Sequence, residues 1–215
     1  MTWFDRGILL LTGLTAIYMI WRLLGRYSQK KGSYDLYYIV GFAVLFVSGV
    51  LLIFLGYEIL GLGGTALSPY ILPVATLIPL GISIGIVKQY YSKFDNLYML
   101  IAIVGFLAIT VTSIAGIEAV KKISVPLFHS IAGLIIFLGP VFASKNGKSS
   151  KGFLWVGIGG VLIGIGGIAL AFLTSGFQLL FFSTEVVLAI LAPILLFMAL
   201  AFSWGFMKDL EKEKE

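Results

Sequence analysis

The chain of 215 residues has no cysteine, a single histidine and only 12% charged residues. The absence of cysteine excludes disulfides, thiolate metal sites, iron–sulfur ligation and cysteine nucleophiles. A soluble domain has about 25% charged residues. The shortage of charge therefore indicates a protein that lies mostly in lipid.

Long apolar stretches occupy most of the chain. Hydrophobic residues make up 60% of it, and the mean hydropathy is +1.06. A helix that crosses a hydrocarbon core of ~30 Å needs roughly 20 apolar residues. Seven stretches of about that length recur, at Gly7–Leu24, Leu36–Tyr57, Tyr70–Val87, Leu97–Ile117, Pro126–Ala143, Phe153–Leu173 and Val186–Met207.

These stretches predict the fold class. A segment in lipid must satisfy its own backbone hydrogen bonds, which favours helices. The runs are continuous rather than alternating apolar with polar, which argues against a transmembrane barrel. We therefore predict an all-α, polytopic membrane helix bundle of about seven transmembrane helices. It forms a single domain over residues 1–207, followed by a short charged cytoplasmic tail at 208–215.

The basic residues gather on alternate connections. The connections after the first, third and fifth spans and the C-terminal tail hold 12 of the 15 basic residues, and the other side holds only Arg6, Lys121 and Lys122. The positive-inside rule places the N-terminus outside and the C-terminus in the cytoplasm of a cell-membrane, multi-pass protein. Attraction to anionic headgroups accounts for the net charge of +5, so nucleic acid is not expected as a partner.

His129 is the only histidine, and it lies within about a turn of the predicted outer end of the fifth span. Three carboxylates approach the same face, those of Glu58, Glu118 and Glu185. Ionisable groups in lipid are costly and are functional candidates. We hypothesise a polar site in the outer leaflet that passes protons, binds a cation or hydrogen-bonds a quinone-like headgroup. The structural alternative is that water and headgroups solvate the glutamates while His129 bonds a neighbouring helix.

The sixth span is rich in glycine. Gly160, Gly164 and Gly167 follow one another at i, i+4 and i+7 and form one smooth helix face. Such faces let helix backbones approach closely in lipid. The face predicts packing inside this bundle or, as the alternative, contact with a partner subunit.

The third span has Pro73 and Pro79 in one apolar run, with Thr76 between them. Proline removes a backbone donor and kinks a helix. Broken helices expose carbonyls to midplane substrate sites in transporters. The two interpretations are a structural kink and a kinked-helix path for a solute.

The sequence lacks residues that several kinds of membrane chemistry require. The seventh span has no lysine before Lys208 for a retinal Schiff base, and one histidine cannot form a bis-histidine haem pair. All four aspartates (Asp5, Asp35, Asp95 and Asp209) fall outside the predicted spans, which argues against an intramembrane aspartyl dyad. We expect no catalytic constellation and no metal site, and the sequence does not indicate a particular cofactor.

Three functions fit this pattern. We favour a non-catalytic integral membrane subunit that anchors or completes a larger respiratory, electron-transfer or transport assembly, with other membrane protein subunits as partners within the lipid bilayer. The first alternative is a small transporter or channel for a proton or a neutral solute. The second is a seven-helix membrane sensor, because the seven-span plan resembles that of rhodopsins, heptahelical receptors and seven-helix sensor modules in topology alone.

Overall fold

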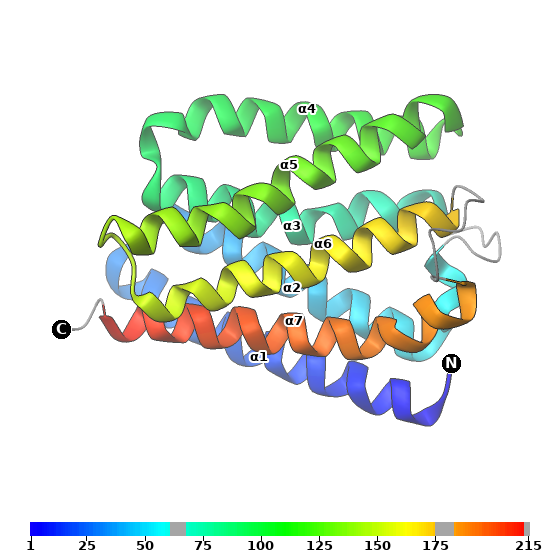
Figure 1. The fold of residues 1–215 in the computed structure, drawn as a ribbon, viewed down its shortest axis with the longest axis horizontal. Coiled ribbons are helices and arrows are strands. Elements are labelled where there is room, and N and C mark those ends of the chain that lie inside the picture. The colour runs from blue at the N-terminus through cyan, green and yellow to red at the C-terminus, as the bar shows by residue number, and fades with distance from the viewer. Residues whose placement is uncertain (61–67, 175–182, 213–215) are drawn as a thin grey trace.

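The computed structural model describes residues 1–60, 68–174 and 183–212, and these form an all-helical bundle without strands (Figure 1). All seven α-helices are long and apolar enough to cross a membrane, which confirms the all-α class and the seven candidate spans. The helices are α1 (Trp3–Lys30), α2 (Ser33–Leu55), α3 (Ser68–Tyr90), α4 (Asp95–Ile114), α5 (Glu118–Lys145), α6 (Leu154–Thr174) and α7 (Thr184–Lys212). The 3-10 turns η1 (Tyr57–Leu60), η2 (Ser92–Phe94) and η3 (Lys151–Phe153) lie in the connections.

Several helices extend beyond the predicted spans. Both α1 and α5 have 28 residues, a rise of roughly 42 Å at ~1.5 Å per residue, so each exceeds a hydrocarbon core of ~30 Å. Glu118 and Lys121, expected in a connection, lie in the first turn of α5. Lys208–Lys212, the first part of the predicted charged tail, continue α7 as a tail that extends the last helix would, and residues 213–215 lie outside the described part of the chain.

Helices that follow one another in the sequence run antiparallel, so α1, α3, α5 and α7 finish at the end of the bundle where α2, α4 and α6 begin (Figure 1). We call this the basic end, because the helix ends and connections there contain Lys30, Lys31, Lys88, Lys93, Lys145, Lys148 and Lys151. The other end is called the opposite end.

Helix α3 is central in the bundle. It packs against α2, α4 and α5, and its residues 78–87 are all buried. A Cβ at Gly81 would lie 2.6 Å from the Tyr37 carbonyl oxygen and 2.9 Å from the Gly41 nitrogen. Glycine is therefore required where the backbones of α2 and α3 touch, the type of contact that small residues permit in membrane bundles.

Aromatic rings fill the core near the basic end. The rings of Phe42 on α2 and Phe206 on α7 meet edge to face at 5.9 Å, and Phe153 of η3 lies 5.6 Å from Phe206. All three side chains are almost completely buried. Edge-to-face pairs of this kind add to the energy of burial, so they fix α7 against α2 and the start of α6.

Helix α4 lies at the edge of the bundle, next to α3 and α5 (Figure 1). Helices α4 and α5 come close at the opposite end, where a short connection joins them, and diverge toward the basic end. An apolar groove lies between the two helices where they diverge.

Candidate functional site

His129 lies deeper in the bundle than the predicted span implied. Because α5 begins at Glu118, His129 is eleven residues inside this helix of 28 residues, roughly 16 Å along its axis at ~1.5 Å per residue. The structure therefore places His129 near the middle of α5, because the helix begins at Glu118, ahead of the predicted span Pro126–Ala143.

The His129 imidazole lies between α5, α6 and α3. A Cβ at Gly167 would lie 2.3 Å from His129 Nε2, so the ring rests directly on the α6 backbone. His129 also lines a small cavity together with Thr76 and Pro79. Its Nε2 is buried and has no hydrogen-bond partner within the described ranges. Three separate sequence candidates, the histidine, the glycine face and the kinked helix, thus meet here.

The glutamates do not join His129. Glu118 pairs with Lys121 on the same helix, and its side chain is 58% exposed. Glu58 in η1 and Glu185 in the first turn of α7 are also exposed. The residues that line the cavity beside His129 include no carboxylate, and within residues 1–60, 68–174 and 183–212 no cluster of three or more His, Asp or Glu could hold a metal ion.

The glycine face of α6 is turned toward α5. A Cβ at Gly160 would lie 2.7 Å from Ile136 Cγ2, and Gly167 faces His129 in the same way. Seven residues separate the two contacts in each helix, so the helices run closely together over two turns. A Cβ at Gly164 would meet nothing within 4 Å.

The hydroxyl groups of α3 bond to its own backbone. Thr76 Oγ1 donates to the Pro73 carbonyl at 2.6 Å, and Ser83 Oγ donates to the Pro79 carbonyl at 2.7 Å. Both prolines are buried. This hydroxyl-to-carbonyl pattern is common inside helices and often accompanies a bend.

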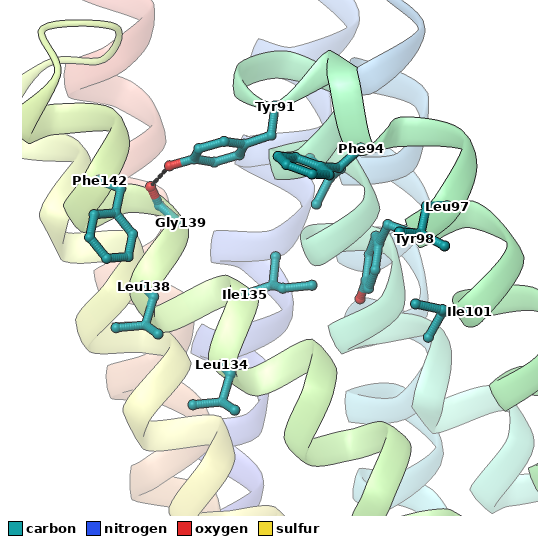
Figure 2. Close-up of a pocket in the computed structure, with 11 residues that line it drawn as sticks. Tyr91, Phe94, Leu97, Tyr98, Ile101, Leu134, Ile135, Leu138, Gly139 and Phe142 are labelled. Carbon is teal, nitrogen blue, oxygen red and sulfur yellow. Dashed lines mark hydrogen bonds between the residues drawn. The ribbon is translucent and has the colours of Figure 1, made fainter.

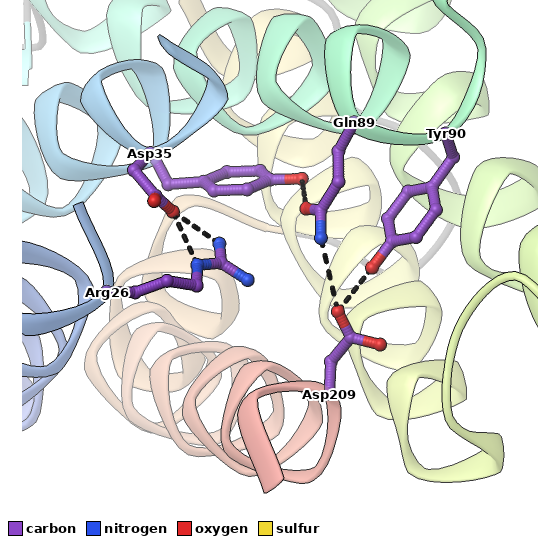
Figure 3. A network of polar contacts seen from close by, with 6 residues as sticks. Arg26, Asp35, Gln89, Tyr90 and Asp209 are labelled. Carbon is purple, nitrogen blue, oxygen red and sulfur yellow. Dashed lines mark hydrogen bonds and ion pairs between the residues drawn. The ribbon is translucent and has the colours of Figure 1, made fainter. Parts of the chain in front are cut away.

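A buried polar network at the basic end was missed by the sequence analysis, which placed its aspartates outside the spans. Asp35 is fully buried, Asp209 is 2% exposed and Arg26 is 5% exposed. Arg26 Nε donates to Asp35 Oδ1 at 2.7 Å across the turn between α1 and α2 (Figure 3).

Asp209 on α7 connects the rest of this network (Figure 3). It accepts hydrogen bonds from the Tyr90 hydroxyl, from Gln89 Nε2 at 3.3 Å and from the Ser150 backbone N–H at 3.1 Å. Tyr38 on α2 donates to Gln89 Oε1 at 2.9 Å. The network therefore links α2, α3, α7 and the connection between α5 and α6.

One sequence signal could have pointed to this network. Arg26 is one of only three arginines in a chain with 12 lysines, and arginine is preferred where a buried cation must bind a carboxylate with fixed geometry. Asp209 had no such signal, because it lies in a run of mixed charge.

An apolar groove of about 350 Å³ separates α4 from α5 near the basic end (Figure 2). Tyr91 crosses its upper end and donates to the Gly139 carbonyl at 2.6 Å. Burial raises the pKa of the Tyr91 hydroxyl above its usual value.

The described residues thus define an all-helical chain whose seven apolar helices are consistent with a multi-pass membrane protein. No protein-family model matches the chain, and neither the curated proteins nor the solved structures include a detectably similar one.

Proposed function

We propose that this protein is a non-catalytic integral membrane subunit that anchors or completes a larger complex in the cell membrane. The observation that carries the proposal is that the buried charges at the basic end join helices. Arg26 binds Asp35, and Asp209 binds Gln89, Tyr90 and Ser150. Paired in this way, buried polar groups rigidify a bundle and specify one arrangement of its helices.

The exposed surface also supports an anchoring role. On α5, Ile123 is 69% exposed, on α4, Leu100 is 59% exposed, and on α7, Phe197 is 61% exposed. Apolar surface of this extent must be covered by lipid or by another transmembrane subunit. In the proposed orientation the basic end faces the cytoplasm, as the positive-inside rule predicts.

Purification of the tagged chain from its native membrane in a gentle detergent tests the proposal. Mass identification of the bound proteins is expected to find stoichiometric membrane subunits, and haem or quinone bands in the absorption spectrum would indicate an electron-transfer assembly. Recovery of the chain alone in several mild detergents would contradict the proposal.

Photo-crosslinking in the native membrane locates the interface. A photoreactive residue placed in turn at Ile123, Leu100 and Phe197 samples three helices, and one of these positions is expected to capture a partner subunit. Ile136 on α5 is fully buried and provides the matched control that captures only this chain.

One observation favours a second candidate, a small transporter or channel for a proton or a neutral solute. His129 Nε2 is unpartnered near the middle of α5, beside a cavity of about 10 Å³, which has room for about one water molecule. Proton flux into liposomes is expected to fall for His129→Gln and to stay unchanged for Gly164→Ala. Equal proton flux in wild type and His129→Gln would exclude a proton path through His129.

A further inference from the structure

The groove between α4 and α5 presents an entirely apolar surface to a bound molecule. Leu97 and Ile101 of α4 form one wall, and Leu134, Leu138 and Phe142 of α5 form the other (Figure 2). The hydroxyl groups at its edge are already bonded, since Tyr91 donates to the Gly139 carbonyl and Tyr98 donates to Ser83.

The dimensions of the groove suit a flexible hydrocarbon chain better than a transmembrane helix. Its volume of about 350 Å³ lies in the range of small-molecule sites. The α5 wall from Leu134 to Phe142 rises only roughly 12 Å at ~1.5 Å per residue, whereas a spanning helix needs ~30 Å.

Positive charge surrounds the basic end of the groove. Lys93 directly precedes the lining residue Phe94, and Lys145 follows Leu138 by seven residues, two helical turns on the same face. Both lysines are exposed. Lys148 Nζ lies 5.8 Å from the centre of the Tyr91 ring.

The nearby acidic charge is already neutralised. Asp95 at the start of α4 accepts a hydrogen bond from Lys88 Nζ at 2.7 Å. The entrance of the groove therefore has an excess of positive charge directly beside an apolar interior.

We infer that this groove binds one anionic phospholipid, with an acyl chain between α4 and α5 and the phosphate between Lys93 and Lys145. Anionic lipids are concentrated in the cytoplasmic leaflet, where the positive-inside rule places the basic end. The lipid site does not depend on the proposed subunit function, because it is built entirely from residues of this chain.

Native mass spectrometry of the delipidated, purified chain tests the headgroup. Phosphatidylglycerol is expected to bind with a stoichiometry of one and more tightly than phosphatidylcholine. The double variant Lys93→Ala/Lys145→Ala is expected to weaken phosphatidylglycerol binding by about tenfold, and to weaken phosphatidylcholine binding less, because the choline cation already offsets the charge of its phosphate. The matched control Lys30→Ala/Lys151→Ala removes two other lysines of the basic end and is expected to bind like wild type.

Filling the groove tests the acyl-chain position. Leu97→Trp places an indole in the groove and is expected to weaken binding of both lipids by about tenfold, because a bulkier side chain overfills the space. Leu100→Trp is the control, because Leu97 and Leu100 are 60% and 59% exposed on the same helix and only Leu97 lines the groove.

Three results would overturn the inference. These are equal affinity of the wild-type chain for the two lipids, equal weakening by the two lysine pairs, and capture of a partner helix by a photoreactive residue at Leu97 in the native membrane. The lipid titrations use the isolated chain, so their failure is distinguishable from failure to find partner subunits.

Discussion

Arg26 and Asp35 form a buried ion pair that fixes the first helical hairpin. Arg26 Nε lies 2.7 Å from Asp35 Oδ1, and the two side chains are 3% and 0% exposed. Only residues 31–32 separate α1 from α2. Lys31 adopts a left-handed conformation with φ of 54°, which reverses the chain and brings the two charges together.

Removing one charge of this pair is expected to destabilise the protein strongly. Asp35→Ala leaves the Arg26 guanidinium buried without its carboxylate, which costs about 3–5 kcal/mol of unfolding free energy. Denaturant unfolding in detergent, followed by tryptophan fluorescence, measures the loss.

Two control variants show whether the loss of stability comes from leaving one buried charge without its counter-ion. Arg26→Met/Asp35→Leu removes both charges and is expected to recover most of the stability. Glu118→Gln breaks the exposed pair with Lys121 and is expected to cost less than about 1 kcal/mol. A fully stable Asp35→Ala protein would show that the pair does not support the hairpin.

Asp209 is expected to protect the connection between α5 and α6 from proteolysis. Asp209 Oδ1 accepts a hydrogen bond from the Ser150 N–H at 3.1 Å, so Asp209→Ala loosens this connection, although Lys212 Nζ still donates to the Gly147 and Ser149 carbonyls. A hydrogen bond to a charged group contributes about 1.5–3 kcal/mol, which predicts about tenfold or faster cleavage by trypsin at Lys148 and Lys151. Glu211→Ala, two residues further along α7, is the control, and equal cleavage rates for the two variants would refute the prediction.

Gly167→Ala is expected to disturb the contact between α5 and α6. The new Cβ would lie 2.3 Å from His129 Nε2, and such overpacking typically costs about 1–3 kcal/mol. Thermal unfolding in detergent should show a lower midpoint than for Gly164→Ala, whose Cβ meets nothing within 4 Å. Gly167→Ala/His129→Ala should restore part of the loss, and the absence of rescue would place the strain elsewhere.

The orientation can be tested in a chain that has no native cysteine. Thr184→Cys places a thiol at the opposite end and Ser92→Cys places one at the basic end, and both positions are exposed. A membrane-impermeant maleimide added to intact cells is expected to label Thr184→Cys, and to label Ser92→Cys only after permeabilisation. The reverse pattern would invert the predicted topology.

The way these helices meet was only partly predictable. The alternation of the lysines predicted which helix ends lie together, because an antiparallel bundle returns every second connection to the same end. The glycines of α6 indicated a close helix contact, but their spacing could not identify the neighbour. Gly167 lies on His129, and this contact depends on the relative rotation of α5 and α6, which residues distant in sequence determine.

The helical class and the seven candidate spans could be predicted from the sequence alone, because length and apolarity are local properties and a helix in lipid satisfies its own backbone hydrogen bonds. Which charges are buried depends instead on how the helices pack. Asp209 and Glu211 lie two residues apart in one charged run, yet Asp209 is 2% exposed and the Glu211 side chain is 52% exposed. The difference arises because Asp209 faces α3 and the connection between α5 and α6, whereas Glu211 faces away from them. The local sequence does not indicate which elements pack against each side of a helix.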